Sequence, residues 1–188
     1  MIHIAIIYHS GYGHTKKVAE LVKEGTNIDG VTSRIFTVEE AKNQLDTLDD
    51  MDAIIFGAPT YMGSASAEMK AFMDATSSKW QDHKWRDKMA AGFTNSGSLS
   101  GDKLSTLIQI SIFAAQHQMI WVSAGLPVAG TQEGHGATAK QVNRLGSFLG
   151  LMTQSDHADL ENTPAPGDKE SAVLFGKRVA QAVQQWTR

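Results

Sequence analysis

Short apolar runs alternate with segments of helical periodicity from one end of the chain to the other. We expect five strands, over Ile2–Tyr8, Val31–Val38, Ala53–Gly57, Met89–Thr94 and Met119–Ala124. Near-continuous apolar runs are typical of strands that are covered on both faces. Their alternation with helices indicates βαβ units around a parallel sheet. The chain is therefore predicted to form an α/β fold with a five-stranded parallel sheet and helices on both of its faces.

Helical patterns fill most of the segments between these strands. They span Lys16–Gly25, Glu68–Ser77, Asp102–His117 and Asp168–Trp186, with a shorter helix expected within Glu39–Met51. In the third pattern the side chains expected to face inward are Leu104, Leu107, Ile108 and Ile112. Asp168 follows Pro166-Gly167 and is the expected N-cap of the last helix. Right-handed crossovers then give a doubly wound sheet, and the length of 188 residues suits one domain over residues 1–188.

Composition excludes several classes of function. Seventeen basic and twenty acidic residues are spread along the chain, giving a formal charge of −3, so nucleic acid is not expected as a partner. There are no cysteines, which excludes disulfides, thiolate catalysis and iron–sulfur ligation. No histidine has the spacing of a common metal motif, so no metal is expected. No apolar stretch is long enough to span a bilayer, and we expect a cytoplasmic protein without a membrane partner.

The loop after the first strand reads Ser10-Gly11-Tyr12-Gly13-His14-Thr15 and runs directly into a helix. Glycines and hydroxyl side chains at a helix N-terminus let backbone N–H groups converge on an anion, such as a phosphate. An ordinary strand-to-helix turn with a threonine cap would read the same way. Two other phosphate motifs are absent. The chain has no P-loop, and a dinucleotide fingerprint would need a third glycine where Lys16 stands.

Two further loops follow buried strands at the expected ligand-binding edge of the sheet. The second loop, Pro59-Thr60-Tyr61-Met62-Gly63, offers flat or polarizable surface for a planar ring. The third loop begins Asn95-Ser96-Gly97-Ser98 and is rich in hydrogen-bonding groups. Taken alone, either loop would be read as packing or solvated chain. Together with the first loop, they supply what a phosphorylated flavin needs.

These loops carry a resemblance to a known family. Ser10-x-Tyr12-Gly13-x-Thr15 resembles the flavodoxin phosphate loop. The block Gly57-x-Pro59-Thr60-x-x-Gly63 with Trp80 after it resembles the WrbA-type NAD(P)H:quinone oxidoreductases, as do the segments 93–97 and 115–119. The resemblance covers roughly residues 2–123 and implies a flavodoxin-like sheet of order 2-1-3-4-5. The chain departs from the family where Tyr61-Met62 replaces Arg-Phe, and the Gly125–Gly150 segment matches poorly.

The resemblance also assigns roles to residues. It places the FMN phosphate against the first loop, the isoalloxazine against the second and the ribityl chain or pyrimidine edge against the third; the residues are Ser10, Tyr12, Gly13, His14, Thr15, Pro59, Thr60, Tyr61, Met62, Gly63, Asn95, Ser96, Gly97 and Ser98. His117 matches a histidine that faces the flavin, and it is the one side chain expected to act in catalysis. Its place at a helix C-terminus would favour its charged form, although a capping role explains the same position. The family further implies a homodimer or homotetramer, with Trp80 and Trp85 near a subunit junction.

The function expected from these features is transfer of two electrons from NAD(P)H through FMN to a quinone or similar small acceptor. Such chemistry belongs largely to the cofactor, and the protein supplies orientation and electrostatics. A flavodoxin-type electron carrier and a scaffold that has lost its flavin are the alternatives. The acidic docking face that is typical of carriers is not evident from a charge of −3. The Gly125–Gly150 segment would be either a lid over the nicotinamide site or an insertion that splits the fifth strand.

Overall fold

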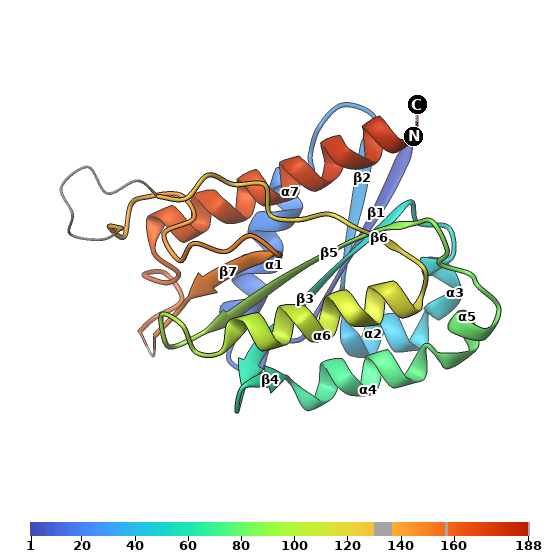
Figure 1. The fold of residues 1–188 in the computed structure, drawn as a ribbon, viewed down its shortest axis with the longest axis horizontal. Helices are drawn as coiled ribbons and strands as arrows, with labels where there is room; N and C mark the ends of the chain where they lie inside the picture. The colour runs from blue at the N-terminus through green and yellow to red at the C-terminus, as the bar shows by residue number, and fades with distance from the viewer. Residues whose placement is uncertain (130–136, 157, 188) are drawn as a thin grey trace.

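The computed structural model describes residues 1–129, 137–156 and 158–187. Its main feature is a parallel sheet of order β2-β1-β3-β5-β6 (Figure 1). The strands are β1 (Ile2–Tyr8), β2 (Val31–Thr37), β3 (Ala53–Tyr61), β4 (Ser64–Ala65), β5 (Met89–Ser96), β6 (Ile120–Trp121) and β7 (Leu151–Gln154). The predicted flavodoxin-like fold is confirmed, and the five expected strands have the expected order.

Helices cover both faces of this sheet. They are α1 (His14–Gly25), α2 (Val38–Asn43), α3 (Leu45–Leu48), α4 (Ala67–Ala75), α5 (Ser77–Gln81), α6 (Lys103–Gln116) and α7 (Pro166–Trp186). One face packs against α1 and α7, and the other against α2, α4 and α6 (Figure 1). Residues 4–7 of β1 are fully buried because both faces are covered, which accounts for the unbroken apolar run in the sequence.

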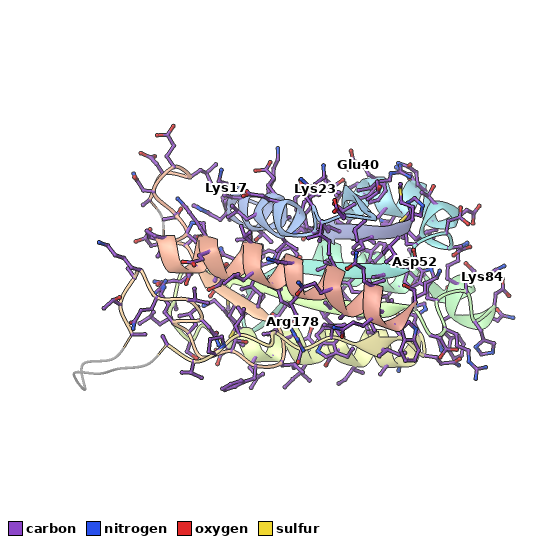
Figure 2. The ribbon with its side chains drawn as sticks, turned by 90° about the horizontal axis from the view of Figure 1, so that it is seen from above. Lys17, Lys23, Glu40, Asp52, Lys84 and Arg178 are labelled. Atoms are coloured by element: carbon purple, nitrogen blue, oxygen red, sulfur yellow. The ribbon has the colours of Figure 1, made fainter. Side chains whose placement is uncertain are left out.

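The helices α1 and α7 cross at very short range. A Cβ atom added to Gly176 on α7 would lie 2.0 Å from the carbonyl oxygen of Val22 on α1. Gly25 on α1 faces the carbonyl of Val173 in the same way. Figure 2 labels Arg178 at the flank of α7, and its Nε donates to the Ser123 carbonyl at 2.9 Å. Glycine at this crossing therefore sets how closely α7 approaches the helix that begins at the first loop.

The third strand is longer than expected. The strand was expected over Ala53–Gly57 with a loop from Pro59, but β3 continues to Tyr61 and turns back into the short antiparallel strand β4. Strand β1 pairs with β3 only as far as Gly57, so beyond that point one side of β3 has no ladder. Proline is tolerated there because its missing N–H leaves no partner unpaired. The extension carries the second loop beyond the end of β1.

The fifth strand is interrupted. β6 pairs in parallel with the beginning of β5, at Met89 and Ala90, whereas β7 pairs with its end, from Phe93 to Ser96. The two short strands thus lie one after the other along β5. Of the two interpretations of the Gly125–Gly150 segment, the structure supports an insertion that splits the fifth strand. Residues 130–136 lie outside the described part of the chain.

Two predictions about helices were wrong. Of the four α6 side chains expected inward, only Leu107 is buried; Leu104, Ile108 and Ile112 are 42–55% exposed, and Ile110 and Ala114 face the core. The helix is apolar on nearly every side, so periodicity could not identify its inner face. The last helix begins at Pro166 with Ala165 as its N-cap, and Asp168 pairs with Arg144 instead of capping.

No helix in the described residues is long and apolar enough to cross a membrane.

Candidate functional site

A cavity of about 520 Å³ lies where the carboxyl ends of β1, β3 and β5 meet. All three predicted loops line it. The lining residues are Ser10, Tyr12, His14, Thr15, Pro59, Thr60, Tyr61, Asn95, Ser96, Gly97, Ser155 and Asp156. Gly13, Met62, Gly63 and Ser98 belong to the same loops but do not line the cavity. The volume falls within the range of small-molecule sites, about 300–1,000 Å³.

The first loop ends in an N-terminus that no side chain caps. Gly13 is the N-cap of α1 at φ 89°, a left-handed conformation that suits glycine, and the first turn contains no acidic residue. The Ser10 hydroxyl accepts a hydrogen bond from the Gly13 N–H at 3.0 Å, which leaves its own proton free to be donated. Thr15 is buried and lines the cavity. Since the first N–H groups of a helix have no intrahelical acceptor, this end can hold an anion.

A segment after β7 covers the first loop, and sequence reasoning missed it. The hydroxyl of Thr163 lies 3.0 Å from Nδ1 of His14, and the Leu160 side chain packs against Gly13. Ser155 and Asp156, at the end of β7, line the cavity directly. Because the expected strands did not include β7, no pattern in the sequence placed this segment beside residue 14. The tertiary fold alone brings it there.

The second loop contributes aromatic surface. Tyr61 is 37% exposed, and its ring meets those of Tyr12 and His9 edge-on, each at a centroid distance of 6.4 Å. Burial raises the pKa of the Tyr61 hydroxyl, so the phenol is neutral near pH 7. Met62 and Gly63 form the tip of the β3–β4 hairpin at positive φ, and Met62 is fully exposed. The flat surface at this cavity is therefore provided by tyrosine.

Hydroxyl and amide groups are fixed beneath the cavity. The buried side chain of Thr60 bonds to the hydroxyls of Thr94 and Thr106, both at 2.8 Å, so only its backbone remains for a ligand. The Asn95 carboxamide oxygen accepts hydrogen bonds from Thr153 at 2.8 Å and Ser155 at 3.1 Å. These contacts tie the third loop to β7. The cavity thus combines an anion site, aromatic rings and an ordered polar edge.

Comparison with known proteins agrees with this geometry. Residues 3–134 match the family model described as NADPH-dependent FMN reductase. The chain is 44% identical to Flavodoxin FldP of Pseudomonas aeruginosa, covering 98% of each sequence, and 30% identical to an NAD(P)H dehydrogenase (quinone) of Archaeoglobus fulgidus, covering 98% of this chain and 99% of the relative. Among solved structures, a WrbA-like flavodoxin from Agrobacterium tumefaciens has 37% identity and a TM-score of 0.76, covering 98% and 99% of the two chains. This chain belongs to the WrbA-type FMN reductase family.

The described residues fit the flavin of this family. The uncapped N-terminus of α1 can receive one phosphate, and the Ser10 and Thr15 hydroxyls can add donors to it. Tyr12 and Tyr61 offer ring surface in the same cavity, and Asn95–Gly97 also line it. A WrbA-type chain with this cavity therefore has the parts needed to hold FMN by its phosphate and its ring.

The structure does not bring His117 to this cavity. His117 follows the C-terminal residue of α6, whereas the third loop comes just before the N-terminus of this helix. The length of α6, about 20 Å, therefore separates His117 from the third loop. Its ring is 4% exposed, lies 4.5 Å from Trp85 and 4.8 Å from Phe113 between centroids, and its Nε2 is 2.9 Å from the Thr76 hydroxyl. Burial lowers the pKa of His117 to about 4, so the expectation of a charged ring was wrong. Its catalytic role stays a prediction.

The two tryptophans differ in their positions. Trp85 is fully buried against Phe56, Phe113 and His117, so it is not available at a subunit junction as predicted. Trp80 is half-exposed and lines a second cavity of about 440 Å³ between α4, α5 and α6. His117, Thr76 and Ile112 line the same cavity. Of the two tryptophans, only Trp80 therefore remains a candidate for a position near a subunit contact.

Proposed function

We propose that this protein binds FMN in the three-loop cavity and uses it to pass two electrons from NAD(P)H to a quinone or a similar small acceptor. The observation that carries the proposal is the meeting of an uncapped helix N-terminus, paired tyrosines and an ordered polar loop in one cavity. When bound, FMN supplies the redox chemistry, accepting a hydride and releasing two electrons. The relatives described as NAD(P)H dehydrogenase (quinone) support the donor and the acceptor class.

The protein's own residues bind and orient. Backbone N–H groups at His14 and Thr15, with the Ser10 and Thr15 hydroxyls, would hold the phosphate and neutralise part of its charge. Tyr12 and Tyr61 would flank the ring, and their exposure leaves room for a second planar ligand beside it. No described side chain in the cavity is required as an acid or base for hydride transfer. Activity would therefore depend on orientation more than on any single titrating group.

A flavodoxin-type carrier is the second candidate, because Flavodoxin FldP is 44% identical over nearly the whole chain. Steady-state NAD(P)H oxidation with a benzoquinone acceptor separates the two. An enzyme consumes NAD(P)H catalytically, with two half-reactions that each reach the rate of turnover in stopped-flow. A carrier is reduced by NAD(P)H slowly or not at all and exchanges electrons only with protein partners. Absence of FMN from the purified protein, together with failure to bind added FMN, would overturn both.

We also propose a homodimer or homotetramer. Leu104, Ile108 and Ile112 form an exposed apolar line along α6, whose single charged residue, Lys103, is buried. Closed symmetry is the usual way to cover such a surface. Sedimentation velocity of the FMN-loaded protein should show the oligomer, and Ile108→Glu should shift it to monomer. Leu174→Glu, on α7 at the other face of the sheet, is the control that should leave it unchanged. Wild-type protein that sediments only as monomer at micromolar concentration would contradict this proposal.

Thr15→Val should weaken FMN binding by about 1–3 kcal/mol, the usual contribution of one hydrogen bond to a charged group. The substitution preserves shape and removes only the hydroxyl, whose residue is buried and lines the cavity. Fluorescence titration of the flavin-free protein measures the change. Thr32→Val, on the outer strand β2, provides the control and should bind FMN as wild type does. Equal affinity in Thr15→Val would show that the phosphate lies elsewhere.

A further inference from the structure

The third loop is held by its carbonyl groups. Lys103 is fully buried, and its Nζ donates to the carbonyls of Ser98, of Leu99 at 3.1 Å and of Ser100 at 3.4 Å. The Gln154 side-chain amide donates to the carbonyl of Gly97 at 3.0 Å. An ammonium has three donors, so the three carbonyls match its full capacity. Four consecutive carbonyls of one loop therefore accept hydrogen bonds from two side chains, the buried Lys103 and the half-buried Gln154.

The insertion in the fifth strand secures the second of these donors. Arg144, within that insertion, donates from Nη2 to the Gln154 side-chain oxygen at 2.9 Å. The same guanidinium forms a bidentate pair with Asp168 on α7, at 2.8 and 3.0 Å. The backbone N–H of Gln154 also donates to Asp168 at 2.8 Å. A chain of contacts, partly buried at Arg144 and Asp168 and exposed at Gly97, thus runs from the insertion through β7 to the cavity wall.

This arrangement fixes the direction of the loop's N–H groups. In a trans peptide the carbonyl and the following N–H point in opposite directions. With the carbonyls of residues 97–100 directed at Lys103 and Gln154, the N–H groups of residues 98–101 are directed away from them. The loop closes through two successive left-handed residues, Gly101 at φ 53° and Asp102 at φ 52°. Aspartate is one of the few non-glycine residues that tolerate this conformation.

We propose that Lys103 is a positioning residue that holds the third loop in the shape that receives the flavin ring. The inference rests on the proposed FMN site and assigns Lys103 to the ring side of that site, apart from the phosphate. Burial lowers the pKa of Lys103 to about 8, with Asp168 opposing this change, so the side chain still carries its charge near pH 7. Gln154, supported by Arg144, would assist it from the other side of the loop.

Lys88 is a matched control for Lys103, because it lies just before β5, whereas Lys103 lies after the loop that follows β5. The Nζ of Lys88 donates to the carbonyls of Asp49 at 2.7 Å and Met51 at 2.6 Å. Burial lowers the pKa of Lys88 as well. Lys88→Met and Lys103→Met therefore remove the same kind of ammonium-to-carbonyl contact. Only Lys103 holds the loop whose first residues, Asn95–Gly97, line the cavity. A purely structural role predicts that both variants lose stability and keep flavin affinity.

The test compares FMN with riboflavin, which has the same ring and no phosphate. The full-length protein is freed of flavin, and dissociation constants are measured by fluorescence titration beside thermal unfolding. Lys103→Met should weaken both ligands by a similar factor, about tenfold or more. Thr15→Val should weaken FMN and spare riboflavin. Lys88→Met should lower the unfolding temperature and leave both constants within about twofold of wild type.

Gln154→Leu provides a second variant in case Lys103→Met does not fold. It removes the donor to Gly97 while keeping the Arg144–Asp168 pair, and it should weaken both flavins by about threefold. Folded Lys103→Met protein that binds both flavins as wild type does would overturn the inference, as would a loss confined to FMN. For an unfolded Lys103→Met, wild-type affinity in Gln154→Leu would overturn it. Wild-type protein that binds neither flavin would instead refute the proposed function itself.

Discussion

Asp168→Ala is expected to lower the free energy of unfolding by about 3–5 kcal/mol, the usual effect of breaking a buried ion pair. Asp168 is 1% exposed and its partner Arg144 is 10% exposed, so the substitution leaves a guanidinium without an anion inside the protein. It also removes the acceptor of the Gln154 N–H. Urea unfolding at pH 7, on wild type and variant in parallel, measures the difference.

Asp74→Ala provides the matched control for this prediction. Asp74 pairs with Lys70 at 2.6 Å, a shorter contact than that of Asp168, but both side chains are more than 60% exposed. Solvent screening limits such a pair to less than about 1 kcal/mol. The double variant Arg144→Met/Asp168→Leu should regain much of the stability, because it leaves no charge unpaired. A loss in Asp168→Ala as small as that in Asp74→Ala would contradict the prediction.

His117 should make the protein lose stability in mild acid. Its pKa is about 4 in the folded protein, because the ring is buried, and 6.5 when exposed in the unfolded chain. Above pH 6.5 the ring is neutral in both states and contributes no pH dependence. As pH falls from 6.5 to 4 the unfolded chain takes up the proton first, so folding becomes less favourable by about 1.4 kcal/mol per pH unit and by about 3 kcal/mol in all.

His117→Gln is the variant that tests this assignment. Glutamine can keep a hydrogen bond to Thr76 and does not titrate, so the variant should lack this part of the acid-induced loss, whatever its stability at pH 7. Carboxylates contribute equally to both proteins and cancel in the comparison. Identical pH dependence in wild type and variant would show that the ring is not buried as described. Quinone reduction slowed by about 10–100-fold in a stable oligomer, with flavin reduction unchanged, would instead support catalysis by His117 across a subunit contact.

The sequence by itself determined the layout of the sheet and most of the cavity. The run Ile4–Ile7 could only be a strand covered on both faces, because it offers no polar side for solvent. Parallel strands place their carboxyl ends at one edge, so the loops that begin at Ser10, Pro59 and Asn95 had to meet there. Local chemistry and the period of the apolar residues were sufficient for this part, since each loop follows its strand directly.

Contacts between distant segments decided the rest. Ser155 lines the cavity and Thr163 contacts His14 only because β7 pairs with the end of β5, after an insertion whose sequence shows no periodicity. The inner face of α6 depends on which of its many apolar residues meets the sheet. Tertiary packing alone determines that Ile110 is buried and Ile108 is exposed. His117 lies away from the loops because α6 runs antiparallel to β5. Sequence patterns report neighbours along the chain, whereas these positions follow from pairing, packing and helix direction.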